Sequence, residues 1–267
     1  MLTITPLSTG AVSIKEAMRR PPGGGPRRRT AMLLPGPMTG ELPIHAWIIE
    51  HPDGLILVDA GESHTARDQL FASFHVRRED ELDHALQAAG YSPSDVATVV
   101  LTHIHGDHVG GLPHVPGARV LVSAAELRFA MSLAGRAQRR IARQPLPPGF
   151  HADGLTLDGP GFGAFASSTP LTADGRVVAV PAPGHTVGHL AVVVVQDDHH
   201  VLLGGDSAYD QSQLLDRRSD GVSPKASVAR ATMDTILGHA RLHPTVYLPS
   251  HDPESVARLR AVATLPA

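Results

Sequence analysis

A run of ten residues from Thr102 to Gly111 reads THIHGDHVGG and holds three histidines and one aspartate within six positions. Imidazole and carboxylate groups at this density can bind one divalent metal ion and place further ligands for a second ion about 3.5–4 Å away. The alternative is a solvated turn that happens to be rich in histidine. Because the run follows the apolar stretch VATVVL (96–101) and leads into glycines, it marks the end of a predicted buried strand.

Similar residues recur at the ends of three further apolar stretches. His185 follows VVAV in PAPGHTVGH, Asp206 follows VLL in GGDSAY, and His251 follows VYL in PSHD. Four strand ends therefore offer ligands that suit zinc and similar divalent ions. This recurrence favours a metal site over a solvated turn, and its five histidines and two aspartates are enough to hold two ions.

Composition limits what such a site can serve. The 267 residues are 42% hydrophobic and 18% charged, which is enough apolar material to bury a large core. The formal net charge of −3 argues against a protein that coats nucleic acid or an anionic membrane, and favours a small-molecule substrate. Because the chain has no cysteine, histidine and carboxylate must hold any metal.

Targeting signals are not evident in the sequence. No apolar run approaches the roughly 20 residues that a membrane span needs, and the N-terminus MLTITPLSTG lacks the layout of a signal peptide. We therefore expect a soluble, cytoplasmic protein without a nucleic-acid or membrane partner, present as a monomer or homodimer.

The elements that must position the metal ligands can be outlined from the hydrophobic pattern. After an early candidate strand, IHAWIIE (44–50) and LILVDAG (55–61) predict two strands joined by HPDG, which is a hairpin. EDELDHALQAAG (79–90) spaces its apolar residues at three and four, which predicts an amphipathic helix. The Pro- and Gly-rich run from Arg19 to Arg29 predicts an exposed loop.

Strands and helices alternate through the second half of the chain. Strand-like stretches are RVLVS, RVVAVPAPG, LAVVVVQ, HVLLGGD and TVYLPSHD. Helices are predicted at Ala124–Leu133, Ser223–His239 and Pro253–Val262. A single domain over residues 1–267, with two sheets between helical layers, is the simplest arrangement of these elements.

The ordered set of LVDAG, HIHGDH, GH, D and H resembles the metallo-β-lactamase superfamily from about His45 to the C-terminus. The resemblance implies an αβ/βα sandwich of two mixed β-sheets flanked by helices, with two metal ions at one edge of the sheets. Seven residues match the family's ligands: His103, His105 and His185 for the first ion, Asp107, His108 and His251 for the second, and Asp206 as the bridge.

Two further residues match positions outside the ligand set. Asp59 in LVDAG corresponds to a family aspartate that supports the site by orienting a ligand; the alternative is a turn residue at a strand end. His189 in GHTVGH is expected to support the site in the same way or to pack within its loop. The remaining histidines, such as His45 and His200, are assigned surface or structural roles.

Two divalent ions that share a water molecule lower its pKa towards neutrality, so a bridging hydroxide becomes available for hydrolysis. Zinc is the expected metal by ligand type, and Mn, Fe or Co accept the same ligands. Other branches of the family fit less well. Its di-iron redox members typically carry a glutamate at the position of His105, and its β-lactamases usually lack an aspartate at the position of Asp206.

One residue favours a particular branch. Tyr209 stands three positions after Asp206 in DSAY, and the quorum-quenching N-acyl-homoserine lactone lactonases have a tyrosine at this spacing, whose phenol reaches the substrate carbonyl. A packed tyrosine without a catalytic role is the alternative. Gly106 departs from that branch, because many of these lactonases carry a bulky aromatic residue there; we expect either a wider pocket with a different acyl preference or a substrate other than an acyl-homoserine lactone.

The sequence therefore predicts a dinuclear metal hydrolase that opens lactone rings, most simply those of N-acyl-homoserine lactones, by attack of a metal-bridging hydroxide. Tyr209 would stabilise the oxyanion and Asp107 would help to protonate the alkoxide. Two alternatives stay open: a hydrolase of organophosphates or other carboxyl esters, and a metal-bound sensor or binding module without turnover. The intact set of seven ligands favours an enzyme.

Overall fold

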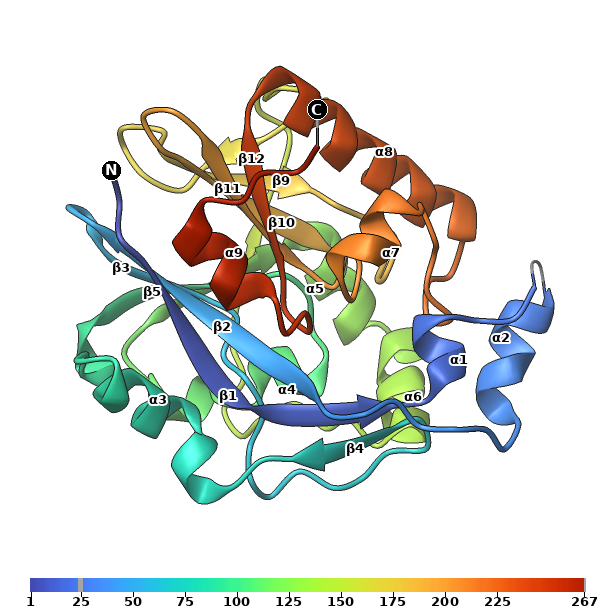
Figure 1. The fold of residues 1–267 in the computed structure, drawn as a ribbon. Coiled ribbons are helices and arrows are strands. Elements are labelled where there is room, and N and C mark those ends of the chain that lie inside the picture. The colour runs from blue at the N-terminus through green and yellow to red at the C-terminus, as the bar shows by residue number, and fades with distance from the viewer. Residues whose placement is uncertain (24–25, 267) are drawn as a thin grey trace.

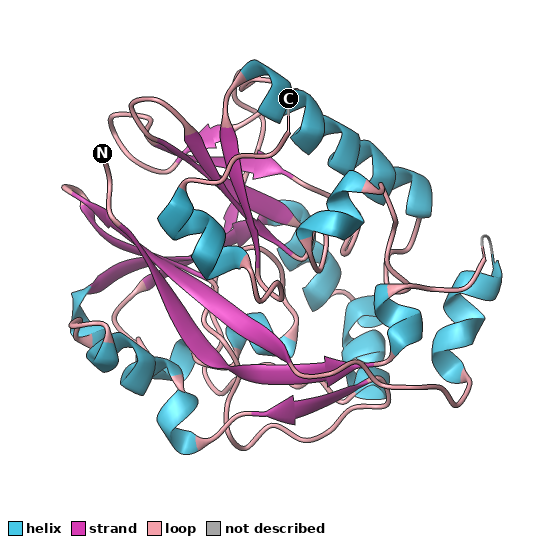
Figure 2. Ribbon diagram, in the orientation of Figure 1, coloured by secondary structure: helices cyan, strands magenta, loops and turns pink. Residues whose placement is uncertain are grey.

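Two mixed β-sheets face each other in the computed structural model, which describes residues 1–23 and 26–266. Helices cover the outer faces of both sheets (Figures 1 and 2). This arrangement confirms the predicted sandwich of two sheets flanked by helices.

The first sheet contains seven strands in the order β4-β1-β2-β3-β5-β6-β7. Their bounds are β1 Ile4–Ile14, β2 Leu42–His51, β3 Gly54–Val58, β4 Ala72–His75, β5 Val96–Leu101, β6 Arg119–Ser123 and β7 Asp153–Leu155. β2 and β3 form the predicted antiparallel hairpin, and β3, β5, β6 and β7 run parallel. Parallel strands are covered on both faces, which explains why β5 reads as a continuous apolar run.

The second sheet contains five strands in the order β12-β11-β10-β9-β8. Their bounds are β8 Thr169–Pro170, β9 Val177–Pro181, β10 Leu190–Val195, β11 His200–Gly205 and β12 Thr245–Pro249. β8 to β11 pair antiparallel, whereas β12 pairs parallel to β11. β11 and β12 therefore end at the same edge of the sheet.

Alternation along the strands divides the core into layers. In β10, Leu190, Val192 and Val194 pack between the two sheets, whereas Ala191 and Val193 point to the opposite face. That opposite face is covered by α8 (Ala226–Leu242), whose Met233, Ile236 and Leu237 join the same cluster. On the outer side of the first sheet, Leu82 and Leu86 of α3 (Leu82–Ala88) occupy the corresponding place. Because successive strand residues face opposite sides, one apolar strand contributes to two layers.

The predicted helices are present with shifted ends, as α3, α5 (Ala124–Met131), α8 and α9 (Ser255–Ala261). The sequence did not predict α1 (Glu16–Arg19), α2 (Pro26–Leu33), α4 (Gly106–Val109), α6 (Leu133–Ala142) and α7 (Gln211–Leu215), or the 3₁₀ turns η1 (Arg78–Asp80), η2 (Pro93–Asp95) and η3 (Leu112–His114). α6 begins anew after α5 because the Ser132 side chain caps it by accepting from the Gly135 N–H. Among the described residues, we find no helix with the length and apolarity needed to cross a membrane.

The prediction of an exposed loop from Arg19 to Arg29 was wrong in part. Arg20, Pro22 and Gly23 are exposed and lie outside helices, but helices enter the run at both ends. α1 ends at its first residue and α2 begins inside it at Pro26, because proline at the first helical position lacks only an N–H that would be unpaired anyway. Arg28 is buried, and its guanidinium donates to the backbone carbonyls of Asp220 and Ser223. The run is therefore attached to the body of the protein; its residues 24 and 25 lie outside the described residues.

The layer between the sheets can be tested with two isoleucines. Ile49 on β2 is 0% exposed between the sheets, so Ile49→Ala should lower the free energy of unfolding by about 2–5 kcal/mol. Ile141 on α6 is 74% exposed, so Ile141→Ala should change it by less than about 0.5 kcal/mol. The single tryptophan, Trp47, packs in the same layer and reports urea unfolding by its fluorescence. Equal losses in both variants would contradict this packing.

Candidate metal centre

Strand ends bring the predicted ligands to one edge of the two sheets. β5 leads into the run that starts at His103, and the loop after β9 carries His185. β11 ends immediately before Asp206, and β12 ends two residues before His251. The seven predicted ligands gather there in two adjoining groups.

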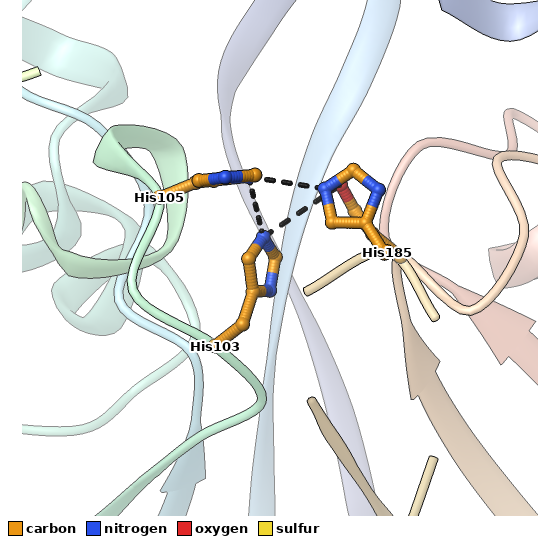
Figure 3. A group of neighbouring side chains, drawn as sticks. His103, His105 and His185 are labelled. Atoms are coloured by element: carbon orange, nitrogen blue, oxygen red, sulfur yellow. Dashed lines mark hydrogen bonds and ion pairs between the residues drawn. The ribbon is translucent and has the colours of Figure 1, made fainter. Parts of the chain in front are cut away.

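The first group contains three histidines whose ring nitrogens face one another (Figure 3). His105 Nδ1 lies 2.9 Å from His103 Nε2 and 3.0 Å from His185 Nε2. Asp206 Oδ2 completes the group, 3.3 Å from His185 Nε2 and 3.9 Å from His103 Nε2. Imidazole and carboxylate atoms that converge in this way are typical zinc ligands, so these four residues could hold one metal ion.

The second group contains Asp107, His108 and His251. His251 Nε2 lies 3.4 Å from Asp107 Oδ2, and His108 Nε2 lies 3.9 Å from Asp107 Oδ1. Asp206 reaches this group with its other oxygen, because Oδ1 lies 3.4 Å from His108 Nε2 and 3.3 Å from His251 Nε2. Asp206 therefore directs one carboxylate oxygen at each group, as a bridging ligand would.

Unpaired buried atoms show whether these groups suit a metal ion. His108 is 0% exposed and Asp206 is 4% exposed. His108 Nε2 and Asp206 Oδ1 nevertheless form no hydrogen bond with each other or with another described residue. Buried polar atoms are rarely left unpaired, because they have lost their interactions with water. Divalent cations would pair these atoms and balance the buried carboxylates, so the residues present fit divalent metal ions.

The other ring nitrogen of four of the histidines has a partner outside the two groups. The partners are Thr102 Oγ1 for His103 (3.0 Å), Asp59 Oδ2 for His108 (2.8 Å), Asp220 Oδ2 for His185 (2.7 Å) and the Pro43 carbonyl oxygen for His251 (2.8 Å). Partners of this kind fix the tautomer and orientation of a ligand ring. Each ring therefore presents one defined nitrogen to the site.

Asp59 lies where a supporting residue is needed. It is buried, and its carboxylate accepts from the Thr102 N–H (2.8 Å) and hydroxyl (2.9 Å) as well as facing His108. Its φ of 60° lies in the left-handed region, which few residues other than glycine adopt without cost, although aspartate tolerates it better than most. The surrounding hydrogen bonds hold this conformation.

His189 contacts the bridging aspartate through the backbone. Its Nε2 accepts from the Asp206 N–H at 3.0 Å, and it is 1% exposed. The neighbouring Gly205 has φ 51°, and a Cβ there would lie 2.8 Å from His189 Nε2. The close approach of this ring to the Asp206 backbone therefore depends on glycine at 205, and support of the site by His189 stays a prediction.

Sequence reasoning missed Asp220 and Glu126. Asp220 lies in RRSDGVS, where no pattern distinguishes it from a solvated turn residue. Glu126 is 3% exposed and accepts from the Ile104 N–H (3.3 Å) and the Gly188 N–H (3.0 Å), so it joins the two loops that carry the first group. Its position four residues before the buried Ala130 on the predicted helix was the one available signal.

Burial and nearby charges shift the pKa values of these histidines in opposite directions. Burial lowers the pKa of His105 to about 3 and the pKa of His103 well below its usual range, so both rings are neutral at pH 7. Burial also opposes the charged form of His108, but nearby carboxylates, above all Asp59, raise its pKa well above the ordinary value. A metal ion at His108 must therefore displace a proton, so acid competes with metal there.

A model of the metallo-β-lactamase superfamily matches residues 39–251. The chain belongs to this superfamily. The match confirms the family predicted from LVDAG, HIHGDH and the later ligands.

Curated relatives include hydrolases and lactonases. Probable metallo-hydrolases of Mycobacterium bovis and Mycobacterium tuberculosis are 38% identical over 186 residues, which cover 64% of this chain and 58% of theirs. The chain thus spans little more than half the length of these relatives. The N-acyl homoserine lactonase AttM of Agrobacterium fabrum is 24% identical over 240 residues, covering 82% of this chain and 86% of that protein.

Solved structures of the superfamily share the fold. An N-acyl homoserine lactone hydrolase with N-hexanoyl-L-homoserine bound at its catalytic metal centre matches with a TM-score of 0.72 and 18% identity, over 99% of this chain and 97% of the other. The dizinc quorum-quenching lactonase AidC matches with a TM-score of 0.65 and 18% identity, over 94% and 88%. At this identity the likeness shows the fold alone.

A cavity of about 610 Å³ opens onto both groups of predicted metal ligands. Tyr209 lines it, 3% exposed, with its ring centroid 5.9 Å from that of His185 and 5.7 Å from that of His251. Burial, followed by the charge of Asp220, raises the pKa of Tyr209 well above its usual value. The phenol therefore keeps its proton and can donate a hydrogen bond.

The expectation of a wider pocket at Gly106 stays a prediction, and the structure shows another side chain close to this glycine. A Cβ at this position would lie 2.5 Å from Glu62 Oε2, so the space is already taken by a carboxylate. Glu62 is 7% exposed, and burial raises its pKa to about 7. Where many similar lactonases have an aromatic ring at this position, this protein has a glycine and the Glu62 carboxylate next to it, so the space differs in polarity as well as in shape.

Asp220 provides a test of the support given to the first group. Asp220→Asn keeps an oxygen that can accept from His185 Nδ1 but removes the charge, so we expect divalent-metal affinity to fall about tenfold, and about a hundredfold in Asp220→Ala. Competition with a coloured chelator measures both values. Asp216→Asn, on an exposed side chain in the same segment, is the control. Unchanged affinity in Asp220→Ala would mean that the contact with His185 is incidental.

Proposed function

We propose that this chain is a dinuclear metal-dependent hydrolase that opens lactone rings, with N-acyl-homoserine lactones as its substrate class. The observation that carries the proposal is Tyr209, whose protonated phenol lines the same cavity as Asp107 and His185. The similarity to AttM over most of both chains supports the choice of substrate.

The proposed ligand sets follow the two groups. The first ion would be held by His103, His105 and His185, the second by Asp107, His108 and His251, and both by Asp206. This mixture of nitrogen and carboxylate ligands suits zinc, and Mn, Fe or Co accept it. Bound there, two divalent ions would supply a hydroxide nucleophile at neutral pH and polarise the substrate carbonyl.

The chain's own residues would then handle charge and protons. Tyr209 would donate to the carbonyl oxygen, and this hydrogen bond strengthens as negative charge collects there in the transition state. Asp107 lines the same cavity and would accept the proton carried by the attacking hydroxide and pass it to the alkoxide that leaves when the ring opens. Asp59 and Asp220 would keep His108 and His185 in position.

The walls of the cavity suit an apolar substituent. Above the polar floor they are formed mainly by apolar side chains: Val12, Ile14, Met18, Met32, Phe71, Phe74 and Ile141. An acyl chain can be removed from water against these surfaces, at about 0.8 kcal/mol for each buried methylene. The proposed partner is accordingly a small, partly apolar lactone.

The metal content tests the dinuclear assignment. Elemental analysis of the purified protein should find about two equivalents of divalent metal per chain, because seven ligands are arranged in two groups. Asp206→Ala should lose metal and activity together, since both groups lose a carboxylate oxygen. Asp198→Ala, on an exposed side chain, should retain both. A fully active protein with one equivalent or none would end the dinuclear assignment.

Tyr209→Phe tests the choice of lactones. We expect kcat/KM for an N-acyl-homoserine lactone to fall about ten- to a hundredfold, or about 1.4–2.7 kcal/mol, at full metal content. Tyr91→Phe is the matched control, because its hydroxyl contacts Glu50 and Thr5 outside the cavity. A parallel assay with paraoxon-like esters separates the alternative substrates. If Tyr209→Phe hydrolyses the lactone at the normal rate with full metal content, Tyr209 is only a packing residue and lactones lose their main support.

A further inference from the structure

A second cavity of about 580 Å³ lies against the α4 turn. Gly106, Val109 and Gly110 of this turn region line it, whereas the intervening Asp107 lines the cavity with the metal ligands. The two cavities adjoin, because both are lined by Gln69, Phe74 and Gln144. The Gln144 amide donates to the Gln69 side-chain oxygen at 3.1 Å, so this hydrogen bond lies between the two cavities.

A buried carboxylate faces this second cavity. Glu62 is 7% exposed, and its Oε1 accepts from the Ser63 N–H at 2.9 Å. The second carboxylate oxygen, Oε2, forms no hydrogen bond with any described residue. Cβ atoms at Gly106 and Gly110 would lie 2.5 and 2.3 Å from the two carboxylate oxygens, so the carboxylate occupies space that only glycine at both positions leaves free.

The surroundings of Glu62 do not explain why a carboxylate is buried there. The cavity walls are largely apolar: Ala66, Phe74, Val109, Pro113, Leu146 and Pro147. Arg67 and Arg143 also line the cavity, but both are exposed, where water and salt screen their charge. The buried Glu62 side chain has a single hydrogen bond with the described residues, from the Ser63 N–H, and a ligand with a hydrogen-bond donor would supply a second one.

We propose that the Glu62 cavity is a second ligand subsite, which takes an apolar chain that ends in a primary ammonium group. The ammonium would donate to Glu62 Oε2, and the chain would lie against the apolar walls. A charged donor is favoured over a neutral one, because a charge-assisted hydrogen bond to a carboxylate is about twice as strong. The inference deepens the proposed function, since a substrate that reaches across Gln69 and Gln144 would carry this group on its acyl chain.

Binding can be tested without any enzymatic reaction. Above about pH 8, where the Glu62 carboxyl with its pKa of about 7 is ionised, millimolar n-hexylammonium should raise the Tm of the metal-loaded protein, whereas hexanoate, with the same chain length and opposite charge, should not. Glu62→Gln should abolish the rise, because the amide lacks the charge. Glu50→Gln, which alters a glutamate outside this cavity that accepts from the Tyr91 hydroxyl, should retain it. Stabilisation by hexanoate, or equal stabilisation of the Glu62→Gln protein by hexylammonium, would overturn the subsite.

Hydrolysis of a matched pair of substrates connects the subsite to the reaction. The two lactones carry the same acyl chain, which ends in a methyl group in one and in an aminomethyl group in the other. Glu62→Gln should lower the ratio of kcat/KM for the amino lactone to that for the alkyl lactone about tenfold, and Glu50→Gln should leave the ratio unchanged. An unchanged ratio in Glu62→Gln, with both rates reduced equally, would mean that Glu62 only supports α4 and would refute the subsite.

The two proposals fail in different ways. If the wild-type protein opens neither lactone but still shows the Glu62-dependent rise in Tm with hexylammonium, the subsite stands and the lactonase assignment fails. If it opens the alkyl lactone and shows no such rise, the lactonase assignment stands and the subsite fails.

Discussion

Burial of the Asp206 carboxylate between two groups of imidazoles is the constraint on which this structure depends. Its oxygens face opposite ways, with Oδ2 directed at His185 and Oδ1 at His251, and Oδ1 has no hydrogen bond of its own. A charge held in this way is costly unless a cation balances it. The fold meets the constraint by ending strands of both sheets at one edge, so that residues far apart in sequence surround a single carboxylate.

Acidic residues outside the two ligand groups hold two of the histidines in position. Asp59 joins the end of β3 to Thr102 and His108. Asp220 contacts His185 with its side chain, while its backbone carbonyl accepts from Arg28 of α2. This helix, which contributes Thr30 and Met32 to the cavity wall, is therefore connected to His185 through a single residue. These long-range contacts set the orientation of the His108 and His185 rings, because the partners that orient them, Asp59 and Asp220, lie far away in the sequence.

The sequence predicted what depends on local pattern. The β2–β3 hairpin, the buried strand β5 and the strand ends at His185, Asp206 and His251 follow from apolar periodicity and turn residues, and the structure has them. What it did not predict depends on distant partners. α2 was hidden by its proline and glycine neighbours, and the burial of its Arg28 arises from carbonyl groups about two hundred positions later in the chain. Asp220, Glu126 and Glu62 look like surface residues until their partners are known.

Gly106 connects the proposed chemistry to the proposed recognition. It stands between His105 and Asp107, which belong to different ligand groups, and it has no side chain where the Glu62 carboxylate lies. Any larger residue at 106 would have to displace this carboxylate from the inner end of the second cavity. If both proposals hold, glycine in place of the aromatic residue that many similar lactonases carry changes the kind of group that is accepted beside the two ligand groups.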